Sequence, residues 1–282
     1  MTEADYLAEQ VGDCLTLARV YVGRAAILAH WGDLPTSIQL GRAALAIMRV
    51  NNEAAGTVAA AFTFVQALWY AGELAEAQEV LAATVGQANS PAGQQRSSST
   101  HVLPAVGFWC YFARFQAELG HHAESLTSIA EARNLAIRIG SLFDQILVDL
   151  NEGAAWLLKG ETERAVELLE RTLRIARANM FEWHVSSIAC LLGTGWIDMG
   201  RNVEARQLLE QASALADRNR HVAKRLLCSP PLIRALTGAP NFDFPNARRL
   251  ADRTLLDTER LGFRPIVQQT HEALLQIKAL ST

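Results

Sequence analysis

Three stretches with the same spacing decide the fold: Gly72-Glu73-Leu74-Ala75-Glu76-Ala77, Gly160-Glu161-Thr162-Glu163-Arg164-Ala165 and Gly200-Arg201-Asn202-Val203-Glu204-Ala205. Related phrases begin at Trp31-Gly32-Asp33-Leu34 and at Gly120-His121-His122-Ala123-Glu124-Ser125. The five glycines lie at positions 32, 72, 120, 160 and 200, so their spacings are 40, 48, 40 and 40 residues. A fixed period of roughly 20–50 residues is typical of repeat proteins such as solenoids. The sequence therefore predicts a chain built from repeats of about 40 residues.

Small residues lie at fixed distances from each of these glycines. Seven residues before the glycine stand Ala25, Val65, Ala113, Gly153 and Gly193. Five residues after it stand Ser37, Ala77, Ser125, Ala165 and Ala205, and twelve after it Ala44, Thr84, Ala132, Thr172 and Ala212. A larger residue follows nine positions after the glycine in four repeats: Leu81, Ile129, Leu169 and Leu209. Because small residues let helices approach and a left-handed glycine ends a helix, each unit is predicted to be helix, tight turn, helix.

The expected architecture is one helical-repeat domain over residues 1–282. Its repeats are predicted at 12–51, 52–89, 101–140, 141–180, 181–220 and 221–261, with a final helix at 265–280 that exposes Gln268, Gln269, Glu272, Gln276 and Lys278. The 48-residue spacing is explained by a polar loop insertion at 90–100, after which Thr100 is expected to cap a helix with Pro104 in its first turn. The chain opens on what should be the second helix of an earlier repeat, which indicates a truncated or excised module or a protomer that packs on something else.

The sixth repeat departs from the pattern. Ala235, Ala247 and Thr254 fit its small positions if the turn centres near Phe242. Its first helix contains Ser229-Pro230-Pro231, and because proline removes a helix hydrogen bond we expect a break there, with Ser229 capping a short second segment.

Composition agrees with a helical globular chain. Half of the 282 residues are apolar, 20% are charged, the formal net charge is −3, and alanine, the strongest helix former, occurs 46 times. No apolar run reaches the roughly 18 residues of a membrane span, and the N-terminus lacks signal-peptide features. The four cysteines form no CxxC pair. These observations predict a cytoplasmic protein with no membrane association and no structural zinc or disulfide framework.

The Gly-[Asp/Glu]-x-x-x-Ala phrase between two helices resembles the tetratricopeptide repeat (TPR), in a variant longer than the usual 34 residues. It resembles in particular the repeats of MalT-type, LuxR-family transcription activators. It also resembles the C-terminal repeats of bacterial multidomain adenylate cyclases, as does Leu261-Gly262-Phe263-Arg264-Pro265-Ile266-Val267. The resemblance implies an all-α, right-handed α-solenoid of antiparallel helix pairs whose first helices line a concave groove. It also implies that the catalytic or DNA-binding domain of such systems lies elsewhere.

No catalytic signature is found in the sequence. There is no phosphate-binding Gly-x-x-x-x-Gly-Lys-[Ser/Thr], no Gly-x-Ser-x-Gly nucleophile elbow and no His-Glu-x-x-His zinc helix. The sequence predicts no enzyme activity, no cofactor and no metal. Trp156 and Trp196 share one repeat position, four residues before the turn glycine, and are expected to pack between repeats.

Two surfaces are candidates for binding. Positions of the TPR groove, carried over by resemblance, select Arg19, His30, Phe62, Gln66, Trp69, Tyr70, Cys110, Arg114, Glu118, Ser187, Cys190, Thr194 and Asp198. The second candidate is a basic patch within residues 218–264, where 10 basic residues outnumber 4 acidic ones: Arg218, Arg220, Lys224, Arg225, Arg248, Arg249 and Arg253. The patch is interpreted as a solvated face or as a docking surface for an acidic partner; nucleic acid is not the expected partner because the chain has no net positive charge.

The function that follows is a non-catalytic protein-interaction or regulatory scaffold, the docking or sensory module of a bacterial signalling or transcription-regulatory system. Its expected partner is a protein, a peptide or an attached effector domain. The alternative hypothesis is a sensor that binds a small ligand or peptide in the concave groove, because aromatic residues with Arg and Gln suit such ligands. An enzyme is the third hypothesis.

Overall fold

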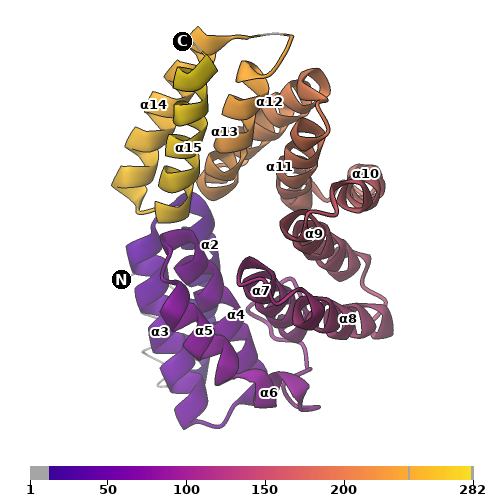
Figure 1. The fold of residues 1–282 in the computed structure, drawn as a ribbon. Helices are drawn as coiled ribbons and strands as arrows, with labels where there is room; N and C mark the ends of the chain where they lie inside the picture. Colours follow the sequence, from indigo (N-terminus) through magenta and orange to yellow (C-terminus); the bar gives the residue numbers. More distant parts are fainter. Residues whose placement is uncertain (1–12, 241, 281–282) are drawn as a thin grey trace. The chain divides into compact units, whose positions relative to one another are not determined.

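The computed structural model describes residues 13–240 and 242–280, and this part of the chain is built from α-helices joined by turns and loops. The helices follow one another in antiparallel pairs (Figure 1). Their bounds are α2 Cys14–Trp31, α3 Leu34–Val50, α4 Ala54–Ala71, α5 Leu74–Ala82, α6 Val85–Asn89, α7 Pro104–Glu118, α8 His122–Arg138, α9 Leu142–Lys159, α10 Thr162–Ala178, α11 Glu182–Asp198, α12 Asn202–Arg218, α13 Val222–Thr237, α14 Phe244–Leu261 and α15 Arg264–Leu280. The predicted all-α fold, a TPR-like solenoid of helix pairs, is confirmed.

Each predicted repeat range contains one helix pair. The first helices are α2, α4, α7, α9, α11 and α13, and the second helices are α3, α5 with α6, α8, α10, α12 and α14. The contacts divide the chain into two compact units, where the sequence predicts one domain. The first unit comprises residues 13–29 and 33–148, and the second comprises residues 30–32, 149–240 and 242–280, so the divisions fall within α2 and α9. The start of the chain, for which an incomplete repeat is expected, lies outside the described residues.

The five turn glycines adopt the left-handed conformation that the repeat pattern predicts, with φ between 76° and 95°. Four turns that join one repeat to the next also have positive φ, at Asn52, Gly140, Met180 and Arg220, and the last three lie 40 residues apart. Met180 and Arg220 are not residue types that favour this conformation, so this second set of turns is not visible from glycine spacing.

Small residues at the predicted offsets form the helix contacts. Every residue at the two positions after the turn glycine is at most 2% exposed: Ser37, Ala77, Ser125, Ala165, Ala205, Ala44, Thr84, Ala132, Thr172 and Ala212. In the second unit, a Cβ atom added to Gly153 would lie 2.6 Å from the Leu169 side chain, and one added to Gly193 would lie 2.7 Å from that of Leu209. The small and large positions of one repeat therefore face each other, as ridges-into-grooves packing requires.

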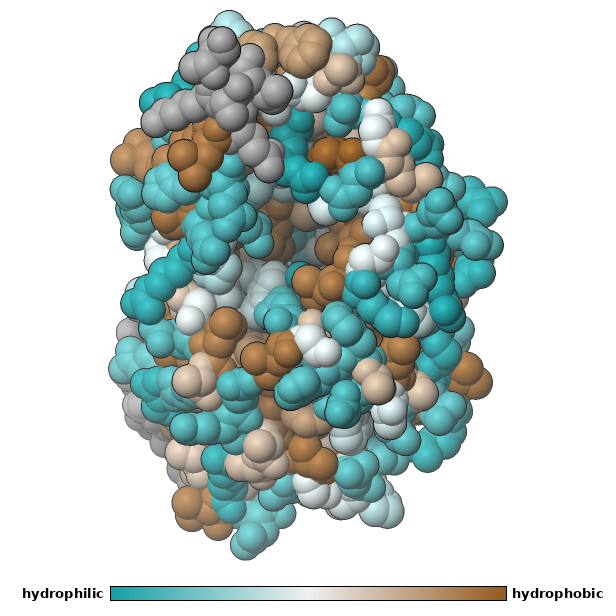
Figure 2. All heavy atoms as spheres, viewed as in Figure 1, coloured by the Kyte–Doolittle hydropathy of each residue, from teal (hydrophilic) through white to brown (hydrophobic). Residues whose placement is uncertain are grey.

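Helix α4 differs from the expectation that no apolar stretch of the chain is long enough to span a membrane. Its 18 residues, Ala54–Ala71, include no charged side chain, and by length and composition the helix could cross a membrane. Because 83% of this window is buried inside the structure, α4 has the surroundings of a core helix, and its composition is weak grounds for a membrane span. The visible face of the molecule in Figure 2 is mostly hydrophilic with hydrophobic residues scattered between, which is ordinary for a protein surface.

The loop after α6 is found where the sequence predicts it, but Thr100 does not cap the next helix. Helix α7 begins at Pro104 with Leu103 as its N-cap residue, and the Thr100 hydroxyl instead donates to the carbonyl of Val102 at 2.8 Å. Proline is accepted at the first helical position because its missing N–H would have no partner there.

The predicted break at Ser229-Pro230-Pro231 is wrong, since α13 runs unbroken through both prolines. Pro231 has no N–H to donate to the carbonyl of Leu227, four residues earlier. The thiol of Cys190, in α11, donates to that carbonyl instead at 3.1 Å. Tertiary contact thus replaces one of the hydrogen bonds that the prolines remove, and Ser229 is an interior residue rather than a cap.

The small residues of the sixth repeat are placed as predicted, because Ala235, Ala247 and Thr254 are fully buried. In the last helix, α15, Gln268, Gln269 and Glu272 are exposed as expected, whereas the side chains of Gln276 and Lys278 lie outside the described part of the chain.

Candidate functional site

The first unit contains a cluster of polar and aromatic side chains where α4 packs on α7. The two helices approach closely, since a Cβ atom added to Gly107 of α7 would lie 2.8 Å from the ring of Phe62 on α4. Helix α4 ends at Gly72, whose left-handed conformation places Trp69 and Tyr70 in the last turn of the helix. We call this cluster the α4–α7 face; its residues are Phe62, Gln66, Trp69, Tyr70, Tyr111, Arg114 and Glu118.

Side chains of the α4–α7 face bind one another across the repeat boundary. Gln66 donates from Nε2 to the Tyr111 hydroxyl at 2.5 Å, and the Phe62 and Tyr111 ring centroids are 5.6 Å apart. The Trp69 indole N–H donates to both carboxylate oxygens of Glu118, at 3.0 and 3.2 Å. These bonds join first helices of consecutive repeats, so the face is held in one conformation by its own polar groups.

Arg114 occupies the centre of this arrangement. Its guanidinium carbon lies 4.7 Å from the centroid of the Trp69 ring, and its Nε donates to Glu118 at 3.2 Å. The Arg114 and Glu118 side chains are 21% and 26% exposed. Guanidinium groups stack on aromatic rings and still present N–H donors in a fixed fork. A cation that is held by one carboxylate and one ring, and is still accessible, can bind an acceptor on a partner.

The two tyrosines of the face stay protonated over the physiological range. Burial raises the pKa of Tyr111 to about 12, against the opposing effects of the Gln66 hydrogen bond and of Arg114. Burial also raises the pKa of Tyr70 well above its ordinary value. Both phenols therefore act as neutral hydrogen-bonding groups and not as bases.

The remaining groove positions selected from the sequence do not join this cluster. Arg19 is half-buried on α2. His30 is 4% exposed and belongs with the second unit. Asp198 of α11 lies exposed and forms an ion pair with Arg234 of α13 at 2.7 Å. Sequence reasoning thus finds the α4–α7 residues, with the exception of Tyr111, but groups them with positions that lie elsewhere.

The predicted basic patch is smaller than expected. Lys224 is only 3% exposed, and the Arg225 side chain lies between Asp217 and Asp257 at 3.1 and 2.8 Å, so neither belongs to an exposed basic surface. The exposed members include Arg218, paired with Glu182 at 3.4 Å, and Arg248, paired with Asp252 at 3.0 Å. The others, also exposed, are Arg220, Arg249 and Arg253. Acidic neighbours compensate much of the charge that the sequence places here.

A second Trp–Arg–Glu cluster lies in the second unit and uses different elements. Trp196 of α11 donates its indole N–H to Glu170 of α10 at 2.9 Å, and the guanidinium carbon of Arg201 lies 4.4 Å from the Trp196 ring centroid. Arg201 also binds two carboxylates, those of Glu170 at 3.2 Å and Glu204 at 3.0 Å. Its donors are thus directed to two acids, whereas Arg114 binds one. Trp156, at the equivalent position one repeat earlier, is 4% exposed, with the guanidinium carbon of Arg164 3.7 Å from its ring centroid.

Sequence reasoning missed a set of buried titratable residues that recur with the 40-residue spacing of the repeats. Asp144, His184 and Lys224 lie 40 residues apart, at the third position of α9, α11 and α13, and each is at most 3% exposed. Asp144 accepts a hydrogen bond from the N–H of Leu103 at 2.9 Å, and the Lys224 ammonium donates to the carbonyl of Trp183. Both bonds reach back 41 residues to the start of the preceding first helix. The 40-residue spacing of these polar residues was the signal that could have revealed them.

Comparisons with known proteins identify the fold. Models of known protein families give no match to the sequence, and no curated relative matches it. A Rap protein complexed with competence and sporulation factor is 12% identical with a TM-score of 0.62, covering 94% of this chain and 75% of its own. Aspartyl phosphate phosphatase F from Bacillus subtilis is 10% identical with a TM-score of 0.59, covering 99% and 74%. Kinesin light chain TPR-like repeats from Podosopora anserina are 18% identical with a TM-score of 0.46, covering 72% and 95%.

At such low identities, the first two neighbours establish likeness of fold alone. The chain has a TPR-like helical-repeat fold. The nearer resemblance to MalT-type activators and to adenylate cyclase repeats stays a prediction, since these neighbours are of other kinds.

Proposed function

We propose that this chain is a non-catalytic protein-interaction module that binds an extended peptide or protein segment across the α4–α7 face. The observation that carries the proposal is the arrangement of Arg114 on α7. It is stacked on Trp69 of α4, the preceding first helix, and is held by a single carboxylate, that of Glu118. Tryptophan, tyrosine and arginine are enriched among residues that dominate binding energy at protein interfaces. In TPR-like solenoids, to which this fold belongs, first helices line the concave face.

The chemistry of the face favours a ligand with both polar and apolar groups. Arg114 offers a cationic donor for a carboxylate or backbone carbonyl, while the half-buried ring of Trp69 offers apolar area. Gln66 and Tyr111 are already ordered by their mutual bond, so little side-chain freedom is lost when a ligand binds. A peptide supplies backbone carbonyls, carboxylates and side chains at such spacings.

The broader biological setting is part of the same proposal. We place the chain in bacterial signalling or transcriptional regulation in the cytoplasm, acting on a protein, a peptide or an attached effector domain. One structural neighbour is a complex with competence and sporulation factor, which supports a binding role for this fold. Another neighbour is named as a phosphatase, so the fold by itself does not separate binding proteins from enzymes. The lack of a catalytic signature in the sequence supports the non-catalytic assignment.

The test is a peptide-display selection on the full chain, followed by fluorescence anisotropy with the enriched synthetic peptides. Trp69→Ala combined with Arg114→Ala should weaken binding by at least about 30-fold, because an interface loses roughly 2 kcal/mol or more at such residues. Trp196→Ala combined with Arg201→Ala is the matched control, since it removes the same pair of residue types from the second unit and should leave the affinity within about twofold. Equal losses in both double variants would refute the assignment to the α4–α7 face.

A small-ligand sensor at the same face is the second candidate, favoured by the half-buried Gln66–Tyr111 pair that could orient a compact polar molecule. Thermal-shift screening of sugars, nucleotides and peptides distinguishes the two. A ligand present at 100 times its Kd adds about 2.7 kcal/mol to the free energy of unfolding. A stabilising small molecule whose effect disappears in the Trp69/Arg114 double variant, with no peptide enriched, would favour the sensor.

A further inference from the structure

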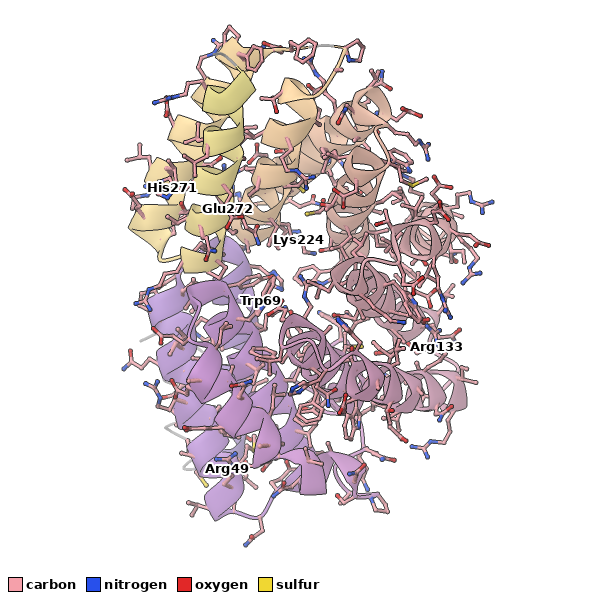
Figure 3. The ribbon with its side chains drawn as sticks, in the orientation of Figure 1. Arg49, Trp69, Arg133, Lys224, His271 and Glu272 are labelled. Atoms are coloured by element: carbon pink, nitrogen blue, oxygen red, sulfur yellow. The ribbon has the colours of Figure 1, made fainter. Side chains whose placement is uncertain are left out.

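The second unit holds two cysteine thiols that approach each other across one repeat boundary. Cys190 belongs to α11 and Cys228 to α13, two first helices that pack directly against each other. Cys228 lies one turn beyond Lys224, which Figure 3 labels. Cys228 is fully buried and Cys190 is half-buried, and both thiols are reduced. The pair therefore lies inside the structure, with one member within reach of solvent.

Each sulfur lies against the main chain of the helical turn that carries the other cysteine. Cys190 Sγ is 3.1 Å from the carbonyl oxygen of Leu227, the residue before Cys228. Cys228 Sγ is 3.8 Å from the carbonyl oxygen of Ser186, to which the N–H of Cys190 is directed within α11. The two side chains also hydrogen-bond one another. This reciprocal arrangement brings the two sulfur atoms together from facing helices, which is the approach that a disulfide requires.

The repeat spacing shows that this pair is particular to the boundary between the fifth and sixth repeats. The equivalent pairs at the four earlier boundaries are Val22 with Ala60, Phe62 with Phe108, Cys110 with Val148, and Leu150 with Ile188. Apolar side chains fill this place elsewhere, so packing alone does not require two cysteines. The chemistry of sulfur is the property that distinguishes the last boundary.

The electrostatics assign different parts to the two sulfur atoms. The hydrogen bond with Cys190 and burial raise the pKa of Cys228 well above its ordinary value. Cys228 therefore stays a thiol at neutral pH, and the first attack on an oxidant falls to Cys190, which is also the member that solvent reaches. Because Cys190 is half-buried, a small oxidant reaches it more readily than a protein does. We propose that Cys190 and Cys228 form a redox-active pair, which hydrogen peroxide or another small hydroperoxide oxidises to a disulfide between α11 and α13.

The oxidation proceeds in two steps, and each step balances. Cys190 Sγ attacks one oxygen of the peroxide, the O–O bond breaks, and the S–H proton leaves with the departing hydroxide as water, so that Cys190 becomes a sulfenic acid. Cys228 Sγ then attacks the Cys190 sulfur, and its proton leaves with the sulfenic hydroxyl as a second water. Two electrons pass from the two sulfur atoms to the peroxide, which is reduced to water.

Oxidation also changes the hydrogen bonding of α13. A disulfide has no S–H group, so the Leu227 carbonyl, which receives no hydrogen bond from Pro231, loses the Cys190 thiol as well. A covalent link between two repeats thus replaces a hydrogen bond at the proline-containing turn. Thiol reductants reverse the change, because they attack the disulfide and restore both thiols.

Peroxide oxidation of the full chain tests the proposal. The reduced protein is treated with hydrogen peroxide, free thiols are blocked with N-ethylmaleimide, and a tryptic digest is analysed by mass spectrometry without reduction. Cleavage after lysine and arginine places each of the four cysteines in its own peptide, with Cys190 in 178–201 and Cys228 in 226–234. We expect the Cys190–Cys228 link to be at least about tenfold more abundant than any other, because thiols that the fold holds together react intramolecularly. Oxidation of Cys190 to a sulfinic acid with no link to Cys228, or equal amounts of other pairings, would overturn the proposal.

Unfolding and two variants separate a preorganised pair from two ordinary thiols. In concentrated urea the preference for the Cys190–Cys228 link should fall severalfold, and an unchanged preference would show that the fold plays no part. Cys228→Ala should make the Cys190 sulfenic acid accumulate, measured as a severalfold increase in its dimedone adduct; an adduct no larger than in the parent would contradict the role of Cys228. Cys110→Ala is the matched control, since it removes a buried cysteine at the same repeat position in the first unit and should leave the link unchanged. If Cys228→Ala does not fold, the mapping of the parent chain with and without urea still decides the proposal.

Discussion

Two tryptophans, one in each unit, meet a cation from the first helix of the next repeat, and the surroundings of the two pairs are opposite. Trp69 carries Arg114 at 4.7 Å from its ring centroid, and Trp183 carries Lys224 at 3.9 Å. Arg114 is partly exposed and paired with Glu118, whereas Lys224 is buried with a main-chain carbonyl and no carboxylate partner among the described residues. Figure 3 labels Trp69 and Lys224.

The difference teaches that one kind of contact can have different electrostatic consequences, depending on burial and on the choice of cation. Arginine keeps its charge in any surroundings, so an accessible arginine is a permanent donor. Lysine loses its proton when buried, so a buried lysine becomes a neutral amine. The two pairs lie at different positions of the repeat, since Trp69 is in the last turn of α4 and Trp183 is in the first turn of α11.

The largest expected effect comes from exchanging the two cations. Lys224→Arg forces a permanent charge and a larger group into the buried surroundings of Lys224. At pH 8 the charge should reduce the free energy of unfolding by about 1.4 kcal/mol, because this pH is one unit above the Lys224 pKa of about 7, and the overpacking by roughly a further 1–3 kcal/mol. Arg114→Lys keeps a charge beside Glu118 at a partly exposed site and should cost less than about 1 kcal/mol. Urea denaturation of both variants measures the two losses; losses of equal size would show that the surroundings of the two pairs are not opposite in effect.

A smaller effect on the free energy of unfolding is expected from a change of one pH unit. The pKa of Lys224 is about 7 in the folded protein and near 10.5 when unfolded, so between these values the unfolded chain binds a proton that the native chain lacks. Stability should therefore rise with pH across this window, by up to about 1.4 kcal/mol per pH unit, and the contribution is lost as pH falls toward 7. Denaturation curves at several pH values measure the slope. The slope should be absent in Lys224→Met and unchanged in Arg114→Lys.

The smallest expected effect lies on the α4–α7 face. Glu118→Gln removes the charge that compensates Arg114 but leaves an acceptor for the Trp69 indole, so the free energy of unfolding should fall by about 0.5–1 kcal/mol. The loss should shrink in high salt, where the ion pair contributes less in the parent protein as well. Glu170→Gln, at the more exposed Trp196 cluster, is the matched control and should cost less. A larger cost for the control would reverse the order of importance given to the two clusters.

Much of the fold could be predicted because the turn glycines and the small positions around them obey one spacing. The residues of the α4–α7 face other than Tyr111 were selected as well, because the resemblance to TPR repeats carries over their groove positions. The unbroken α13 was not, because its stability depends on a thiol from another repeat that replaces a missing main-chain donor. The turns at Met180 and Arg220 were missed for a similar reason: neither residue type favours positive φ, so the packing of the repeats must impose it.

The bonds between consecutive repeats run in both directions. The thiol of Cys190, in the fifth repeat, donates to the Leu227 carbonyl that Pro231 leaves free in the sixth, whereas Lys224 of the sixth repeat donates to the Trp183 carbonyl of the fifth. Asp144 of α9 likewise accepts from the N–H of Leu103 at the start of α7 in the repeat before it. In a nearest-neighbour description of a repeat protein, these bonds belong to the interfaces and not to the repeats. Neighbouring repeats are therefore mutually dependent, because each leaves buried polar groups unpaired until the other has formed.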